Sequence, residues 1–325
     1  MVAEGEVTLD VKDLRTHFFT RRGVAKAVDG VSFRLRRGET LGLVGESGSG
    51  KTMTGLSLLR LVPQPAGRIV GGEVRLLGEN LLTKSQAEMR HIRGRLISMI
   101  LQDPMTSLNP VFNIGFQVAE GIHAHQGLRG KSLWDKAEEA LRLVRISSPK
   151  DRLKNYPHEM SGGMRQRAVG AIVLSCQPAV VIADESTTSL DVTIQAQYLQ
   201  LLRDIQRESS LSIIFITHDF GIVAQMCDRV AVMYAGRIVE SGSVLDLFDH
   251  PAHPYTRALL ASVPNMESRL ERLPSIEGQP PALGSLPEGC RFRPRCREVD
   301  EKCQEGYPPE VEVAPEHFVS CWGVM

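Results

Sequence analysis

The sequence predicts an α/β fold in which parallel strands end at one edge of a sheet. Three stretches support this prediction. Thr40–Val44 is a short apolar strand, and a glycine-rich turn and a helix over Thr52–Leu61 follow it. Ala179–Ala183 and Leu211–Ile216 are apolar runs of strand length, each followed by polar residues. Because open α/β sheets bind ligands at the carboxyl ends of their strands, we expect a ligand site at that edge.

The turn after the first of these strands fits the phosphate-loop pattern G-x-x-x-x-G-K-[ST] without a mismatch. Backbone N–H groups of such a loop surround a phosphate, and the positive end of the helix dipole adds to the attraction. Lys51 would then reach the β- and γ-phosphates of ATP, and the Thr52 hydroxyl would ligate Mg²⁺. The predicted nucleotide contacts of the loop are Gly45, Ser47, Gly48, Ser49, Gly50, Lys51 and Thr52.

Composition excludes several classes of protein. The 325 residues are enough for one large domain with an appendage, or for two domains. Lys plus Arg equals Asp plus Glu at 38 each, so no basic excess suggests nucleic acid as a partner. No apolar run approaches the roughly 20 residues that cross a bilayer, and the first ten residues lack the apolar core of a secretory signal. We therefore expect a cytoplasmic protein.

Polar residues at the strand ends form a predicted catalytic set with Lys51. Asp184 suits an Mg²⁺-bound water, and Glu185 suits the general base for the water that attacks the γ-phosphate. Gln102 can contact both Mg²⁺ and that water, and His218 can hydrogen-bond the γ-phosphate. A strand ending in Asp-Glu, or a single His, is usually structural. Their convergence downstream of a phosphate loop favours a site instead.

An aromatic segment, His17-Phe18-Phe19, precedes the loop. Phe18 is the better candidate to stack on the purine base of a nucleotide. A core phenylalanine is an equally good interpretation of the same position.

The phosphate loop, Gln102, Ser161-Gly162-Gly163, Asp184-Glu185 and His218 resemble, in order and spacing, the nucleotide-binding domain of ABC transporters. The resemblance implies a P-loop ATPase core with an antiparallel β subdomain and an α-helical signature subdomain. In that family the Ser-Gly-Gly residues bind the γ-phosphate of ATP held by the opposite subunit. Two ATP molecules are thus sandwiched in a head-to-tail dimer. Ser189-Leu190-Asp191 matches the loop that crosses the interface.

Longer motifs resemble the ATPases of oligopeptide/dipeptide importers, at residues 102–110, 191–197, 233–240 and 253–256. This resemblance implies import of di- or oligopeptides, or of a related substrate such as nickel or an oligosaccharide. It also implies a second ATPase subunit, two membrane permease subunits and an external binding protein, with this chain at the cytoplasmic face of the inner membrane. Met164 and Ser186 depart from the general ABC pattern, which has Gln and Pro there. Every residue type that contacts phosphate or metal in the family stays in place, so hydrolysis is expected to survive.

Two other functions are compatible with parts of the sequence. One is a soluble ABC ATPase that acts on nucleic acid or ribosomes. The absence of sustained heptads between residues 53 and 160, and the single cassette, count against it. The other makes the clustered C-terminal cysteines a redox switch on the ATPase, although a structural role is the default.

We expect an ABC ATPase domain over residues 1–260, with its helical subdomain at about 103–170, and a Pro-rich linker and Cys-rich extension over 261–325. The extension is too short to bury a core of its own, so it is expected to need a staple such as a bound metal. The tail resembles an importer extension that carries a 4Fe–4S cluster in some members. A 4Fe–4S cluster is the first candidate for the state of these cysteines. Zinc is the second, because the cysteine spacing is unlike the C-x2-C that zinc sites usually have. Free thiols are the third. The expected ligands are Cys290, Cys296, Cys303 and Cys321.

Overall fold

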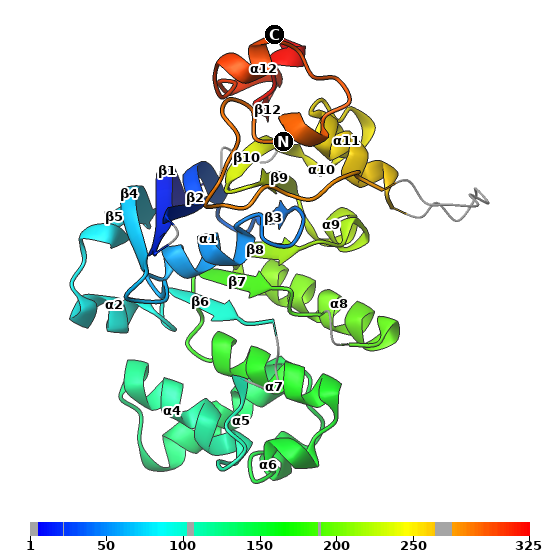
Figure 1. Ribbon diagram of the computed structural model, residues 1–325. Helices are drawn as coiled ribbons and strands as arrows, with labels where there is room; N and C mark the ends of the chain where they lie inside the picture. The colour runs from blue at the N-terminus through cyan, green and yellow to red at the C-terminus, as the bar shows by residue number, and fades with distance from the viewer. Residues whose placement is uncertain (1–5, 22, 103–106, 188–189, 264–274) are drawn as a thin grey trace. The chain divides into compact units, whose positions relative to one another are not determined.

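The computed structural model describes residues 6–21, 23–102, 107–187, 190–263 and 275–325 (Figure 1). The chain divides into two compact units. The first unit comprises Met1–Thr8, Leu35–Glu39 and Thr83–Ile214. The second unit comprises Leu9–Arg34, Thr40–Leu82 and Phe215–Met325.

The first unit joins a parallel strand pair to a group of helices. Strands β6 (Ile97–Ile100) and β7 (Val180–Asp184) pair in parallel from Ile97↔Val180 to Ile100↔Ala183. All five residues of β7 are buried, as expected for a parallel strand covered on both faces. Within this unit helix α7 packs against β6, and α4 and α5 pack against α7 (Figure 1). The helices are α2 (Gln86–Ile92), α4 (Ile114–Gln126), α5 (Gly130–Leu143), α6 (Pro149–Arg152), α7 (Gly162–Leu174) and α8 (Val192–Ser209).

Short polar side chains fix where three of these helices begin. Asn113 caps α4, Ser161 caps α7 and Asp191 caps α8. Each side-chain oxygen accepts a hydrogen bond from the backbone N–H three residues further on. That bond satisfies one of the free donors at a helix start, which is why these residue types occur there.

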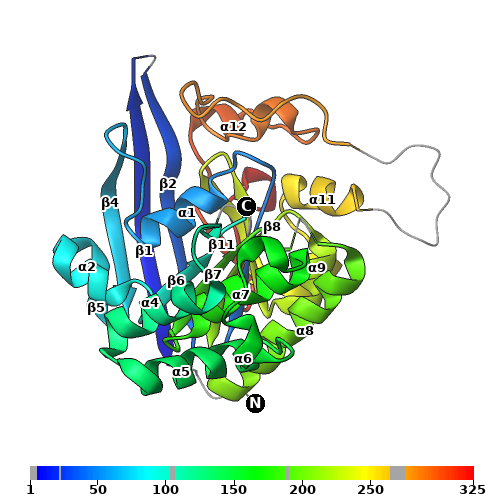
Figure 2. The same cartoon turned by 90° about the horizontal axis from the view of Figure 1, so that it is seen from below.

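An antiparallel sheet in the second unit has the strand order β2-β1-β4-β5. Its strands are β1 (Val7–Thr20), β2 (Gly23–Arg36), β4 (Gly67–Leu76) and β5 (Glu79–Asn80). Figure 2 shows β1, β2 and β4 side by side, with helix α1 (Lys51–Leu58) next to them. The hydroxyls of Thr16 on β1 and Ser57 on α1 are hydrogen-bonded at 2.7 Å.

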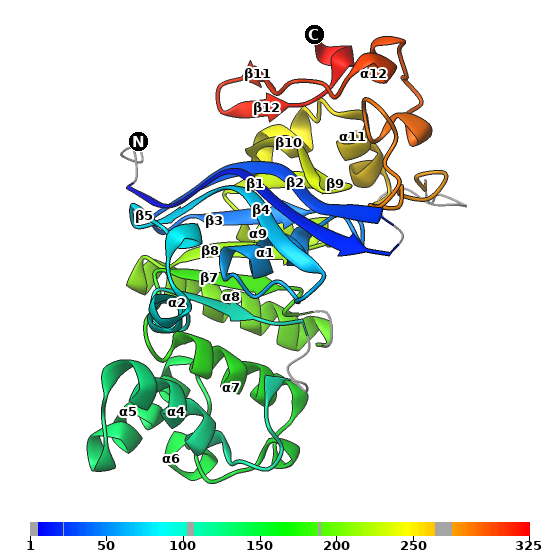
Figure 3. The same ribbon diagram turned by 60° about the vertical axis from the view of Figure 1, so that its left-hand side comes forward.

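A second group of strands carries the phosphate loop. Strand β3 (Thr40–Val44) runs parallel to β9 (Arg229–Tyr234), and β9 pairs antiparallel with β10 (Arg237–Ser243). The C-terminal strands β12 (His317–Val319) and β11 (Val311–Ala314) continue from β10 (Figure 3). The last part of the chain therefore extends the sheet that holds β3.

The remaining elements complete the two units. Strand β8 (Ser212–Thr217) spans the point at which the chain passes from the first unit into the second. The second unit also contains α9 (Phe220–Met226), α10 (Val244–Asp249), α11 (Pro254–Ala261) and α12 (Lys302–Glu305). None of the helices in the described ranges combines the length and the apolar character that crossing a bilayer requires.

The prediction of a 4Fe–4S cluster in the C-terminal extension is wrong. Across the ranges that the structure describes, which include Cys290, Cys296, Cys303 and Cys321, no group of three or more His, Cys, Asp or Glu is arranged to hold a metal ion. Zinc, which would use the same cysteines, has no support either. None of these four described cysteines forms a disulfide.

The physical reason lies in how the extension packs. Phe292, Cys290 and Cys303 join one buried cluster with Tyr234 and Tyr255 of the cassette. The extension therefore shares the apolar core of the second unit, and the hydrophobic effect stabilises it without a staple.

Candidate active site

Glycine is required at two positions of the phosphate loop between β3 and α1. The backbone φ is 147° at Gly45 and 107° at Gly50, where residues with a side chain rarely lie. A Cβ added at Gly45 would lie 2.2 Å from the Met233 carbonyl oxygen, and one at Gly50 would lie 2.3 Å from that of Ala27. The loop has this shape only because both positions lack a side chain.

The loop also presents donors that suit a phosphate. The Lys51 side chain is buried, and its ammonium donates to the carbonyl oxygens of Gly45 at 2.6 Å and Glu46 at 2.9 Å. The Ser49 hydroxyl is buried and has no hydrogen-bond partner among the described residues. A buried polar group without a partner is costly, and a phosphate oxygen would satisfy it. The donor set therefore fits the predicted anion.

Carboxylates lie at the end of β7 in the first unit. Asp184 is its last residue and is only 3% exposed. Glu185 follows with φ of 44°, in the left-handed region that is strained for a residue with a side chain. The Gln102 amide, which follows β6, donates to the Glu185 carboxylate at 2.7 Å from Nε2 to Oε2. The structure thus brings together two of the predicted catalytic residues.

The Ser-Gly-Gly signature forms the start of α7. Ser161 is its N-cap, and Gly162 and Gly163 are the first two helical residues. A Cβ at Gly163 would lie 2.7 Å from Ile194 Cγ2 of α8, whereas a Cβ at Gly162 would meet nothing within 4 Å. Gly163 therefore permits close helix packing, and Gly162 leaves the helix start open. A helix start with free N–H groups favours anions.

Two further candidates lie in the second unit. His218 is exposed just after β8, and the next residue, Asp219, caps α9. Phe18 on β1 is half-buried, and its ring lies close to Gly67 on β4: a Cβ there would be 2.8 Å from Phe18 Cε1. Their roles toward ATP stay predictions. Ser189, of the expected interface loop, lies outside the described residues.

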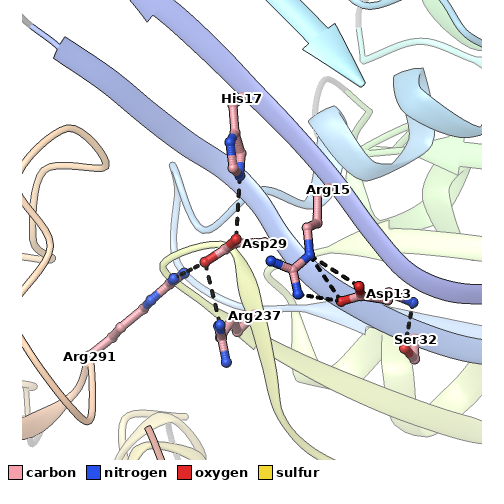
Figure 4. Close-up of polar contacts among 7 residues, drawn as sticks. All are labelled: Asp13, Arg15, His17, Asp29, Ser32, Arg237 and Arg291. Atoms are coloured by element: carbon pink, nitrogen blue, oxygen red, sulfur yellow. Dashed lines mark hydrogen bonds and ion pairs between the residues drawn. The ribbon is translucent and has the colours of Figure 1, made fainter. Parts of the chain in front are cut away.

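The sequence motifs did not reveal a buried carboxylate, Asp29 on β2. It is hydrogen-bonded by Arg237 at 3.5 Å, by Arg291 and by His17 at 3.3 Å (Figure 4). Burial by itself would raise the pKa of Asp29, but the hydrogen bond and charge of Arg291, with the charge of Arg237, outweigh it and hold that pKa at about 2. A lone Asp in a strand gives no sequence signal for such a network.

Solved structures with this fold are ATP-binding cassettes. The dimeric post-hydrolysis structure of the cassette MJ0796 bound to ADP and Pi superposes with a TM-score of 0.64 at 22% identity, covering 73% of this chain and 98% of that one. The cbiO1 protein of Clostridium perfringens gives 0.65 at 25% identity, over 75% and 92% of the two chains. The fold with its mixed α/β sheets is therefore that of an ABC ATPase, and the ABC transporter family model matches residues 28–188.

Relatives of similar length show to which family of ABC ATPases the chain belongs. A probable peptide ABC transporter ATP-binding protein of Sinorhizobium fredii is 52% identical, over 98% of this chain and 96% of its own length. The dipeptide transport ATP-binding protein DppD of Bacillus subtilis is 47% identical over 98% and 95%. Residues 239–303 match the family model for the C-terminal region of oligopeptide/dipeptide transporters. The chain belongs to the ATP-binding proteins of peptide ABC transporters, and it is an ATPase that uses ATP with Mg²⁺.

Proposed function

We propose that this chain is the ATPase subunit of an importer for di- or oligopeptides, or for a related substrate such as nickel or an oligosaccharide. The similarity to peptide-transport ATP-binding proteins over 98% of the chain carries the proposal. It extends through the C-terminal region that has its own oligopeptide/dipeptide transporter model. The alternative of a nucleic-acid or ribosome ATPase has no comparable support.

The phosphate loop binds the triphosphate in this proposal. Lys51 is already held over the loop by two carbonyl oxygens, and a γ-phosphate would compete for its ammonium as a stronger, charged acceptor. The Ser49 hydroxyl and the backbone N–H groups supply further donors. Phe18 is proposed to stack on the adenine ring.

Hydrolysis needs a base for the attacking water. We assign that role to Glu185, and Gln102 orients its carboxylate through the 2.7 Å hydrogen bond. His218 is assigned to hydrogen-bond the γ-phosphate. Thr52, Gln102 and Asp184 would supply the oxygen ligands that Mg²⁺ prefers, and the bound ion would supply positive charge at the phosphates.

Ser161, Gly162 and Gly163 are assigned to the ATP of a second ATPase subunit, either another copy or a paralogue. Binding closes the head-to-tail dimer, and hydrolysis reopens it. Two permease subunits receive the motion, an external binding protein delivers the substrate, and this chain works peripherally at the cytoplasmic face of the inner membrane.

Co-purification tests this proposal. The tagged chain is recovered from native membranes in mild detergent, and the proteins that accompany it are identified by mass spectrometry. The complex is then reconstituted in proteoliposomes with ATP, and uptake of a labelled dipeptide, a labelled pentapeptide, nickel and a labelled oligosaccharide is compared. We expect two permeases and ATP-dependent peptide uptake. Recovery of only soluble proteins or nucleic acid would overturn the transport function.

A further inference from the structure

An arginine of the C-terminal extension contacts the phosphate loop directly. Arg295 ends the short 3-10 helix Arg293–Arg295, and its guanidinium pairs with both carboxylate oxygens of Glu46. The distances are 2.6 Å from Nη1 to Oε2 and 3.0 Å from Nη2 to Oε1. The Arg295 side chain is 3% exposed and that of Glu46 is 27% exposed. A bidentate pair shielded in this way fixes both position and orientation.

Glu46 is the second residue of the phosphate loop, and each of its polar groups has a partner. Its backbone N–H donates to the Tyr255 hydroxyl at 2.9 Å, and its carbonyl oxygen accepts from Lys51 at 2.9 Å. The Arg295 pair holds the side chain. Glu46, whose carbonyl oxygen accepts from Lys51, is therefore held at two points. Arg295 of the extension holds its side chain, and Tyr255 of α11 holds its backbone N–H.

Arg295 is itself rigidly held. Its Nε donates to the Glu277 carbonyl oxygen at 3.0 Å, and its Nη2 lies 3.4 Å from the Ile276 carbonyl oxygen. Its Nη1 also lies 3.4 Å from the Tyr234 hydroxyl. The hydrogen bond that Arg295 donates to the Glu46 carboxylate is the main reason that the pKa of Arg295 is raised. The guanidinium is thus charged and preorganised, so little freedom remains to be lost on pairing.

A second anchor docks the same part of the extension. Arg291 pairs with the buried Asp29 (Figure 4) and donates to the Ala235 carbonyl oxygen. Between the two arginines, the Phe292 ring packs edge-on against Tyr234, with centroids 5.2 Å apart and an interplanar angle of 85°. An ion pair on each side of the buried Phe292 ring fixes the extension against β2 and the phosphate loop.

We propose that Arg295 is a positioning residue for ATP binding. Through Glu46 it holds the start of the phosphate loop in the shape that receives phosphate, so that the C-terminal extension sets the ATP affinity of the cassette. The inference rests on the proposed role of Gly45–Thr52 in binding the triphosphate. It requires Arg295 to act on binding rather than on the chemical step, because no atom of Arg295 belongs to the hydrolytic groups.

The test compares the full-length Glu46→Gln, Arg295→Ala and Arg295→Lys variants. Binding of a fluorescent ATP analogue gives Kd, and steady-state ATPase assays give KM and kcat. We expect Kd and KM to rise by about 10- to 100-fold with kcat at saturating ATP little changed, because small displacements of a binding loop have effects of this size. Arg295→Lys keeps the charge but loses the two-pronged geometry, so it should lie between wild type and Arg295→Ala.

A double-mutant cycle separates positioning from general destabilisation. The Arg295→Ala, Glu46→Ala double variant should be no worse than either single variant, so the coupling should equal the effect of one single variant, about 10- to 100-fold in Kd. Arg297→Ala is the matched control, because Arg297 pairs with Glu277 at an exposed site, 81% and 82% exposed. Its Kd should equal that of wild type.

The Lys51→Ala variant separates the role of the phosphate loop from the role of Arg295. If Lys51→Ala still binds the analogue normally, the role of the loop is wrong. If Lys51→Ala loses binding while Glu46→Gln and Arg295→Lys, both folded by circular dichroism, bind like wild type, the positioning role of Arg295 is overturned. Strictly additive effects of Arg295→Ala and Glu46→Ala would overturn it too.

Discussion

The amide of Gln102 donates a hydrogen bond to the carboxylate of Glu185, with 2.7 Å between Nε2 and Oε2. The hydrogen bond fixes the orientation of the carboxylate, and a general base has to lie within hydrogen-bond reach of the water that it activates. Gln102 and Glu185 follow the parallel strands β6 and β7, so the pairing register of the two strands brings them together.

Glu185→Gln is expected to retain ATP binding and to lose turnover by about 10²–10⁴-fold, the contribution of a general base. The change keeps the size of the side chain, so the fold is preserved. ATP binding and phosphate release measure the two effects. Glu208→Gln, at an exposed position of α8, is the control and should hydrolyse at the wild-type rate. Wild-type turnover by Glu185→Gln would remove Glu185 from the base role.

Asp29→Asn is expected to lower the free energy of unfolding by about 3–5 kcal/mol, because Arg291 and Arg237 lose the charge that compensates their burial. Urea denaturation measures this change in the free energy of unfolding. Asp13→Asn is the matched control on the neighbouring strand (Figure 4), since Asp13 pairs with Arg15 at an exposed site and should cost about 1 kcal/mol or less. If both variants lost the same free energy of unfolding, the buried Asp29 ion pairs would stabilise the protein no more than an exposed pair does.

The low pKa of Asp29 predicts that the free energy of unfolding depends on pH. The pKa of Asp29 is about 2 in the folded chain, against about 3.9 in an unfolded one. A lowered folded-state pKa stabilises the protein above the unfolded pKa, and this stabilisation is lost as the pH falls from about 4 toward 2. The stability difference between wild type and Asp29→Asn should therefore shrink by about 2 kcal/mol across that window. A difference that stays constant between pH 5 and pH 2.5 would contradict the low pKa.

Gly50→Ala is expected to abolish ATP binding. The added Cβ would lie 2.3 Å from the Ala27 carbonyl oxygen, so the loop would have to change shape. Gly127→Ala is the control, because Gly127 also has a positive φ, 67°, but a Cβ there meets nothing within 4 Å. Both should lose about 1–2 kcal/mol of stability from the unfavourable backbone, yet only Gly50→Ala should lose the nucleotide. Normal affinity in Gly50→Ala would contradict the tight fit.

The extension is expected to keep its fold when metal is removed. Burial raises the pKa of the Cys290 thiol to about 11, so at pH 7.5 this group stays protonated and reacts slowly with iodoacetamide. The half-buried Cys296 and Cys321 should react sooner. Dialysis against a chelator should leave the thermal midpoint unchanged. Iron or zinc recovered in stoichiometric amount with the purified chain would contradict this expectation.

The sequence by itself determined the ATPase fold and the family. The phosphate loop is a contiguous run whose chemistry depends on local backbone shape, so the letters Gly45 to Thr52 are sufficient to identify it. The signature Ser161-Gly162-Gly163 is likewise local, because a helix cap depends only on the next three residues.

Only the tertiary structure decided what the C-terminal extension is. The clustering of four cysteines in a short tail suggested a metal staple, but the side chains of Cys290 and Cys303 are buried with Phe292, Tyr234 and Tyr255 of the same unit. The ion pair from Arg295 to Glu46 joins residues that lie 249 positions apart in the chain. Contacts of this kind depend on which surfaces meet after folding, and no periodicity or local motif records them. The packing of apolar surface, which is non-directional, therefore decided the structure of the tail.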